Sequence, residues 1–366
     1  MKQCCKFKKI IRLILLIISL VALGLSGVTI EVVKNPRPTC RETKFVELKL
    51  IKSLVPEIDQ DNYLAMPCSV VVDGQENLFV FDRNQAEIYK FDAKGRFITK
   101  FGRVGKGPGE FGAKGLISQV YLSLAPGNKL MAQDYTNARL TLFSLDGKYL
   151  KDYLVRYRHP FQPLIDDKGF IYVPSTHDGV VDVFDEKMNL VKVLLDEAVF
   201  RKFLFFEPGI SFKRKLIFPY RNIHFFLVAD DKLLVYIDNA STVFILKDFK
   251  LESMYNLWPE KVLPAYKRDL AELIETCPPE SDCYGSFIVS IFPDNDDRKY
   301  FYVQFSSYPE RDKKVLLHRF DLKGRLDKNL TVKFKAEEFP VFQYKYRQLF
   351  YAFGNETLLF YKEEKL

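Results

Sequence analysis

The segment from Asn77 to Phe111 constrains the fold of this chain more than any other part of the sequence. It reads NLFVFDRNQAEIYKFDAKGRFITKFGRVGKGPGEF, an order of short strand, polar turn, strand, Lys-Gly turn, strand and Gly/Pro-rich loop. Weaker copies of this order recur along the chain at spacings of roughly 40–70 residues, which is typical of a repeat architecture. A four-stranded antiparallel unit of this kind cannot bury both of its faces alone.

Radial repetition of such units buries both faces and leaves few open strand edges. The sequence therefore predicts an all-β fold, a six-bladed β-propeller of four-stranded antiparallel blades, with strands a to d running outward from a central channel. The blades are expected at residues 68–101, 119–156, 161–195, 223–257, 285–333 and 340–362. Seven blades remain the alternative if residues 199–219 contain further strands.

The last blade lacks a fourth strand within its own stretch of sequence. Residues 44–51, KFVELKLI, alternate apolar and polar side chains and have no other partner. We expect this N-terminal strand to complete blade six and to close the ring, since closure removes an edge that would otherwise pair with other chains.

The basic charge of the chain lies at its N-terminus. Of the formal net charge of +8, residues 1–39 carry +6, because Glu31 is the one acidic residue there. The rest of the chain is nearly neutral and shows no basic stripe of the kind that binds nucleic acid. We therefore expect no nucleic-acid partner.

An uncharged apolar run follows at residues 13–30. It is long enough to cross a bilayer, and the preceding positive charge places the N-terminus in the cytoplasm. We expect a single-pass transmembrane signal-anchor helix in the cytoplasmic membrane, with the propeller on the exported, periplasmic or extracellular side. The expected divisions are a basic tail at 1–12, the helix at 13–30, a linker at 31–43 and the propeller at 44–366. Cleavage of the run as a secretory signal is the alternative.

Two cysteines, Cys277 and Cys283, bracket the short segment CPPESDC. A disulfide between them suits an exported insert, and two free thiols or an incomplete metal site are the alternatives. An apolar stripe in the same insert predicts a helix at 259–276, which caps the channel or packs on the surface. Cys40 and Cys68 are expected at opposite faces of the ring. A seven-residue strand spans roughly 23 Å, well beyond the Cα spacing of about 4.4–6.8 Å in a disulfide, so we expect no bond between them.

The repeat of blade one also resembles a known family. The resemblance is carried by Phe81-Asp82, residues 88–92, Gly95, Phe97, residues 101–103 and residues 105–111. These positions are similar to the NHL-type repeats of exported bacterial six-bladed propellers, most clearly in blade one and in part in blades two and five. The resemblance implies the same fold and little about activity, because many members of that family have no assigned reaction.

Loop lengths indicate which face of the ring carries function. Loops d–a and b–c open on one face, here called the loop face, whereas a–b and c–d turns open on the other, the turn face. The d–a loops at 103–118, 196–222 and 259–284 are long, and c–d turns such as 92–96 and 321–325 are tight. Long loops on a rigid scaffold usually carry function.

Five polar residues on the loop face form the candidate ligand-binding set, namely Arg83, Arg103, Asp134, Arg139 and Arg311. Jointly they suit an anionic or peptide ligand, whereas each alone suits an ordinary solvated surface.

The glycine-rich sequence at 102–112 lacks the Lys-Ser/Thr pair of a phosphate-binding loop. We interpret it as a d–a turn in which Glu110 and Phe111 anchor the loop to the next blade.

Three histidines, His159, His177 and His224, belong to blades three and four and could approach one quadrant of the loop face. Three imidazoles suit zinc, so a divalent metal is one hypothesis. Their spacing matches no compact metal motif, and ordinary solvent-facing histidines are the alternative. We expect no other cofactor, and no catalytic motif stands out.

The sequence supports three functional hypotheses. The first is an exported, membrane-anchored module that binds a protein, peptide or glycan ligand, or acts as a scaffold, through its loop face. The second is a metal-dependent propeller lyase or hydrolase with a site at the channel mouth. The third is a structural partner in an envelope complex. The small number of metal-ligating residues favours the first.

Overall fold

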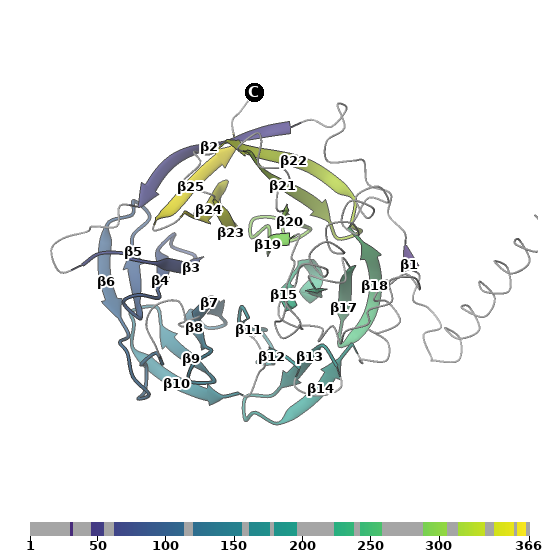
Figure 1. The fold of residues 1–366 in the computed structure, drawn as a ribbon. Coiled ribbons are helices and arrows are strands. Elements are labelled where there is room, and N and C mark those ends of the chain that lie inside the picture. The colour runs from purple at the N-terminus through teal and green to yellow at the C-terminus, as the bar shows by residue number, and fades with distance from the viewer. Residues whose placement is uncertain are drawn as a thin grey trace, which may run out of the picture.

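The computed structural model describes residues 30–31, 45–54, 62–112, 120–155, 161–175, 179–195, 223–237, 242–257, 288–305, 314–333, 340–354 and 357–363. These residues are almost entirely β-strands and turns, and the helical element among them is the short 3₁₀ turn η2 (Ala229–Asp231). The strands stand as blades around a central axis (Figure 1). The expected all-β propeller is confirmed.

Each blade is ordered a, b, c, d outward from the centre. Blade one contains β3 (Pro67–Val72), β4 (Leu78–Asp82), β5 (Glu87–Phe91) and β6 (Phe97–Phe101). Blade two contains β7 (Val120–Ala125), β8 (Lys129–Asp134), β9 (Arg139–Ser144) and β10 (Tyr149–Leu154). Blade three contains β11 (Leu164–Ile165), β12 (Ile171–Pro174), β13 (Val181–Phe184) and β14 (Leu190–Leu194).

The other three blades follow the same order. Blade four contains β15 (Ile223–Leu227), β16 (Leu233–Ile237), β17 (Thr242–Lys247) and β18 (Lys250–Asn256). Blade five contains β19 (Ile288–Pro293), β20 (Tyr300–Phe305), β21 (Lys314–Asp321) and β22 (Leu326–Lys333). Blade six contains β23 (Val341–Tyr346), β24 (Leu349–Phe353) and β25 (Leu358–Glu363), and its fourth strand is β2 (Phe45–Leu54).

The N-terminal strand β2 closes the ring as expected. Residues 48–54 pair antiparallel with β25 and complete blade six. Residues 45–47 pair in parallel with residues 329–331 of β22 in blade five, a contact that the sequence did not indicate. One strand therefore covers the outer edges of two blades and leaves neither open there.

Five turns of the turn face repeat one hydrogen-bonded unit. In each, an Asp carboxylate accepts from the backbone N–H groups two and four residues later, and the residue three positions later has a positive φ. The unit begins at Asp73, Asp92, Asp166, Asp185 and Asp321. The positive-φ residue in these five turns is Glu76, Gly95, Gly169, Met188 and Gly324, respectively. The predicted tight turns at 92–96 and 321–325 are thus confirmed.

The core lies between the blades. Each of the four apolar clusters among the described residues crosses at least one blade boundary. Phe111, at the end of the glycine-rich loop, is fully buried, with its ring centroid 5.0 Å from that of Phe81 in blade one and 6.2 Å from that of Phe143 in blade two. Burial of such a side chain stabilises the fold by about 1.5–3 kcal/mol, so the predicted anchoring by Phe111 is confirmed.

Two local differences from the sequence prediction have physical causes. Strand a of blade three, expected at 161–166, is reduced to β11, because Pro163 has no N–H to donate to a strand ladder. A short strand β1 (Ile30–Glu31) pairs in parallel with β18 and adds a fifth strand to blade four. Ile30 was expected at the end of the apolar helix, but the outer edge of β18 offers unpaired backbone groups that it satisfies.

Several predictions fall outside the described residues. These are the apolar run before Ile30, most of the linker, the insert helix at 259–276 and the possible extra strands at 199–219. Within the ranges that the structure describes, no helix is long and apolar enough to cross a membrane.

Candidate functional site

A cavity at the centre of the ring receives residues from the innermost segment of every blade. Its volume is about 140 Å³. The lining combines apolar and polar side chains: Ser69, Val70, Tyr121, Phe161, Gln162, Ile223, His224, Ser290, Ile291, Val341 and Gln343. Because all six blades contribute, the cavity exists only in the closed ring.

Irregular strand pairing shapes part of this wall. The innermost strands β3, β19 and β23 each contain a register shift against strand b, at 67–69, 288–290 and 342–344. Such a bulge adds an unpaired residue and re-aims its side chain. In β23 the cavity-lining Gln343 lies at the shift, and its Nε2 donates to the carbonyl oxygen of Cys68 at 3.3 Å.

Glutamines on strand b fasten neighbouring blades beside the cavity. Gln304 is fully buried, accepts from the N–H of Phe342 at 2.8 Å and donates to the carbonyl oxygen of Pro340 at 2.8 Å, both in blade six. Gln133 has the equivalent place in blade two and accepts from the N–H of Phe161 in blade three at 3.4 Å. These bonds satisfy backbone groups at the inner edge of the sheets, where no further strand follows.

Arg83, the first residue of the b–c loop of blade one, brings a positive charge toward the cavity. Its Nε is buried and has no hydrogen-bond partner, and its guanidinium forms no ion pair with any described residue. Burial raises the pKa of the Cys68 thiol and of the Tyr121 hydroxyl to about 12 each, and the charge of Arg83 opposes both shifts. Tyr121 lines the cavity, and Cys68 adjoins the lining residue Ser69. The positive charge of Arg83 therefore lies close to this edge of the cavity, here called its rim.

Two aspartates at the ends of strand b hold the loop face in place. The carboxylate of Asp82 accepts from the backbone N–H groups of residues 65, 66, 84 and 85. That of Asp134 accepts from the backbone N–H groups of residues 112, 136 and 137. Both side chains are buried, and desolvation raises the pKa of Asp134. Asp134, a predicted ligand-binding residue, is thus engaged within the fold.

Arg139 clamps the glycine-rich d–a loop of blade one. Its guanidinium donates to the carbonyl oxygens of residues 106, 107 and 110 and pairs with Asp152 at 3.1 Å. Within the loop, Glu110 accepts from the N–H of Gly107 at 2.7 Å and from Nε of Arg103 at 2.7 Å. Arg139 is only 5% exposed, so its donors serve the loop, whereas Arg103 extends into solvent beside Glu110.

The structure places one residue of the predicted metal set in the cavity. His224 lies in β15, and its ring centroid is 6.2 Å from that of Tyr236. The remaining predicted site residues lie outside the described residues: His159, His177, Arg311, Cys277 and Cys283. Among the residues that are described, no group of three His, Cys, Asp or Glu is arranged to hold a metal.

Cys68 is a free, half-buried thiol. Cys40, with which we expected Cys68 to form no disulfide, lies outside the described residues.

The lining residues Tyr121, Gln162 and Gln343 were not anticipated from the sequence. A signal existed, because each is a polar side chain within or beside a predicted innermost strand, where apolar residues are the rule. Their convergence required the ring.

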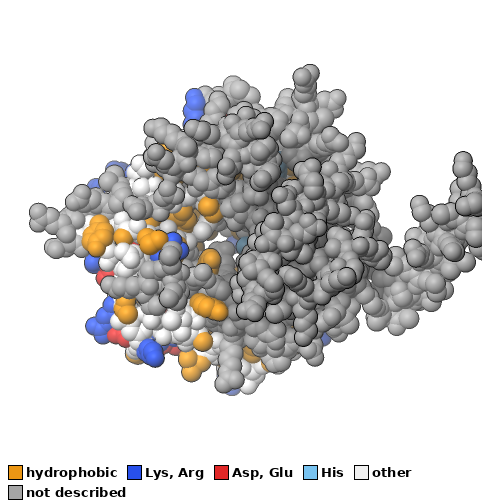
Figure 2. Space-filling view, in the orientation of Figure 1, with side chains coloured by type: hydrophobic (Ala, Val, Ile, Leu, Met, Phe, Trp, Pro, Cys, Tyr) orange, Lys and Arg blue, Asp and Glu red, His pale blue; other side chains and the backbone are white. Residues whose placement is uncertain are grey.

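The described part of the face seen in Figure 2 lies over blades one and two, beside the central hollow. Hydrophobic side chains gather there together with Lys and Arg side chains. On the loops of these blades, Tyr63, Val104 and Tyr135 are exposed by 45%, 42% and 39%.

The chain matches a known family of propellers. Residues 59–306 match the family DUF5128, described as "6-bladed beta-propeller". The chain belongs to this family of six-bladed propellers. The family match agrees with the six blades seen in the structure, rather than with seven.

Solved structures share the fold of this propeller. A protein from Bacteroides fragilis NCTC 9343 that is assigned as exported aligns with a TM-score of 0.57 at 15% identity, over 92% of this chain and 100% of that chain. A member of the DUF4221 family from Bacteroides vulgatus aligns with a TM-score of 0.51 at 12% identity, over 88% of this chain and 99% of that chain. At these identities the similarity shows the fold alone.

A part of the propeller is also similar to "Protein brain tumor" of Drosophila melanogaster. The two are 25% identical over 126 residues, which cover 34% of this chain and 12% of that protein.

Proposed function

We propose that this propeller is a binding module whose ligand enters the central cavity from the loop face. The observation that supports this most is that all six blades line the central cavity. Its polar lining residues, among them Tyr121 and Gln343, offer donors and acceptors that orient a ligand, as in known small-molecule sites. A volume of about 140 Å³ suits one group of a larger ligand, such as a peptide side chain or one sugar unit.

The positive charge of Arg83 indicates that the ligand carries an anionic group. A guanidinium beside a partly desolvated rim binds carboxylates and other oxyanions strongly, and no described residue neutralises Arg83. The exposed Tyr63 and Tyr135 on neighbouring loops offer the amphipathic surface that peptide- and glycan-binding sites use.

The proposal is tested by screening the full-length protein against peptide and glycan arrays that include acidic members. We expect retained ligands to be lost in Arg83→Met and to bind less tightly as salt rises. The matched control is Arg96→Met, because Arg96 lies in a c–d turn on the opposite face. Equal retention by wild type and Arg83→Met would contradict binding at this rim.

Export and membrane attachment belong to the same proposal. They rest on the uncharged run at 13–30 and the positive residues before it. Protease treatment of intact cells should cleave the propeller from outside the cytoplasmic membrane, and N-terminal sequencing of the mature protein should begin at Met1 or Lys2 for a retained anchor. A mature protein that starts after residue 20 would indicate signal cleavage instead.

The metal-dependent lyase or hydrolase remains a sequence prediction, since two of its three histidines lie outside the described residues. Elemental analysis of the full-length protein, dialysed without chelator, tests it. One equivalent of zinc that is lost in His224→Ala would support it.

A further inference from the structure

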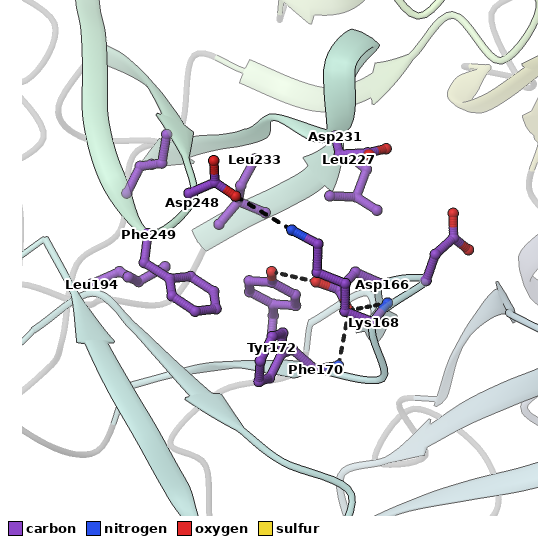
Figure 3. A pocket seen from close by; sticks show the side chains of 12 residues that line it. Asp166, Lys168, Phe170, Tyr172, Leu194, Leu227, Asp231, Leu233, Asp248 and Phe249 are labelled. Atoms are coloured by element: carbon purple, nitrogen blue, oxygen red, sulfur yellow. Dashed lines mark hydrogen bonds and ion pairs between the residues drawn. The ribbon is translucent and has the colours of Figure 1, made fainter.

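A second cavity lies on the turn face, between blades three and four (Figure 3). It is bounded by the a–b turns of both blades and by the c–d turn of blade four, and its volume is about 180 Å³. It shares no lining residue with the central cavity. The two cavities are therefore separate sites.

The interior of this inter-blade pocket is apolar and aromatic. Leucine side chains and the rings of Phe170, Tyr172 and Phe249 line it. Phe170 and Phe249 meet edge to face with their centroids 5.2 Å apart. A dry cavity of about 150 Å³ holds a molecule the size of benzene, so this one can receive the alkyl part of a side chain.

The rim of the pocket is acidic. The carboxylates of Asp166, Asp167, Asp231 and Asp248 line it against the single ammonium of Lys168. Lys168 forms an ion pair with Asp248, marked by a dashed line in Figure 3. Its Nζ lies 3.3 Å from Oδ1. These two side chains are 62% and 70% exposed, and an ion pair in such a setting contributes little. Asp231 forms no ion pair with any described residue.

We propose that this pocket receives a Lys or Arg side chain from a partner protein. An alkyl stem on the leucine and phenylalanine surface leaves the cationic head among the rim carboxylates, the arrangement that long basic side chains favour. The aromatic rings add attraction for the cation. In the unbound protein, Lys168 occupies the place of the partner's cation beside Asp248. Its ammonium leaves Asp248 when the partner's side chain enters.

The turn that carries Phe249 provides a sharp test. Asp248 and Phe249 form a two-residue hairpin turn with φ values of 47° and 64°, in which Gly is the preferred second residue. Gly at position 249 therefore relieves the backbone while it removes one aromatic wall of the pocket. The matched control is Gln348→Gly, because Arg347 and Gln348 form the equivalent turn of blade six, with φ values of 46° and 67°, away from the pocket.

The experiment uses full-length protein with labelled leucine methyl groups and titrates it with acetyl-Gly-Lys-Gly-amide by NMR at low salt. We expect saturable shifts of the pocket leucines and no comparable shifts with the norleucine peptide, which has the stem without the charge. Phe249→Gly should weaken binding at least tenfold while the protein stays folded, because the relieved turn offsets part of the packing lost against Phe170. Gln348→Gly should bind like wild type. Lys168→Ala should bind several-fold more tightly.

Three results would overturn the proposal. They are equal shifts with the norleucine peptide, unchanged binding in Phe249→Gly, and no gain in Lys168→Ala. Shifts of the same leucines that depend on protein concentration without peptide would assign the side chain to a second copy of this chain, and would overturn the assignment to a partner protein.

Discussion

At the residue scale, the turn face repeats one backbone geometry with different side chains. The position with positive φ is a glycine at Gly95, Gly169 and Gly324, but it is Glu76 in the a–b turn of blade one, with a φ of 66°. A side chain in this conformation costs about 1–2 kcal/mol, and glycine loses about 0.5–1 kcal/mol of that advantage through the entropy of the unfolded chain. The balance favours glycine.

We therefore expect Glu76→Gly to raise the free energy of unfolding by about 0.5 kcal/mol, after loss of its exposed ion pair with Arg347. Urea denaturation measures this. Gly127→Ala is the opposite control. A Cβ there meets only the end of the Lys129 side chain, at 3.6 Å, but the alanine keeps a φ of 75°, so the substitution should destabilise by about 1 kcal/mol. A loss of stability in Glu76→Gly would show that its contacts outweigh the backbone strain.

A buried histidine makes the stability of the fold depend on pH. His318 in β21 is 1% exposed, and its Nδ1 contacts the side-chain oxygen of Asn329. Burial lowers the pKa of His318 to about 4, whereas the unfolded chain binds its proton near pH 6.5. Because the unfolded state takes up the proton first, stability falls as pH drops from about 6.5 to 4, by about 3 kcal/mol in total.

His318→Gln should remove this component, since glutamine keeps a hydrogen-bonding group and does not titrate. Urea denaturation at pH 7 and pH 4 should show a loss between the two pH values that is about 3 kcal/mol smaller than in wild type. An identical pH dependence in both proteins would place the acid sensitivity elsewhere.

At the scale of elements, one buried side chain joins a loop to the next blade. Arg139 of β9 bonds three carbonyl oxygens of the glycine-rich loop and the carboxylate of Asp152. Arg139→Met should destabilise by about 3 kcal/mol, because it leaves Asp152 without its cation. Arg139→Lys should rescue little, since an ammonium cannot form the same fork of bonds.

Limited proteolysis checks the loop itself. Both variants should be cut faster than wild type within residues 102–111, because the loop loses its anchor. Thermal melts give the stability change. Full rescue by lysine would show that charge alone, rather than the geometry of the bonds, holds the loop.

At the scale of the whole molecule, closure depends on one strand that is remote in sequence from its partners. Leu48 of β2 is 3% exposed and packs in the cluster shared by blades five and six, whereas Leu50 on the same strand is 50% exposed. Leu48→Ala should lower the free energy of unfolding by about 2–4 kcal/mol. Leu50→Ala should change it by less than about 0.5 kcal/mol.

Circular dichroism during urea denaturation measures both variants. We expect a single transition for Leu48→Ala at lower urea, because an open ring exposes strand edges on both of its neighbouring blades. Equal effects of the two substitutions would show that β2 adds backbone pairing only.

Most of the architecture was predictable because its determinants are local. Period-two alternation, such as that in residues 44–51, and Asp/Gly turns such as 92–96 specify strands and hairpins without knowledge of the rest of the chain. One exception was also local in cause, because Pro163 shortened β11. The other was not, because β1 pairs with the edge of β18, which is remote in sequence.

The candidate site was predictable only in part. Loop position predicted Arg83, Asp134 and Arg139 as residues of the loop face, but it did not reveal that Asp134 and Arg139 are buried within the fold. A polar residue after a strand looks the same in sequence whether it faces solvent or bonds a neighbouring loop. The difference is made by backbone groups about 20–30 residues away.

The repeat and the strands within each blade thus follow from the residues alone, since they depend on patterns within about ten neighbouring positions. Ring closure could be inferred because blade six lacks a fourth strand in its own stretch of sequence and residues 44–51 form an unpaired strand pattern. The two cavities could not be inferred in this way. The central one needs side chains from six blades, and the inter-blade pocket needs Phe170 and Phe249, which are distant in the chain and meet only after blades three and four have packed. Tertiary structure decides such sites because binding depends on distances between residues that no local pattern encodes.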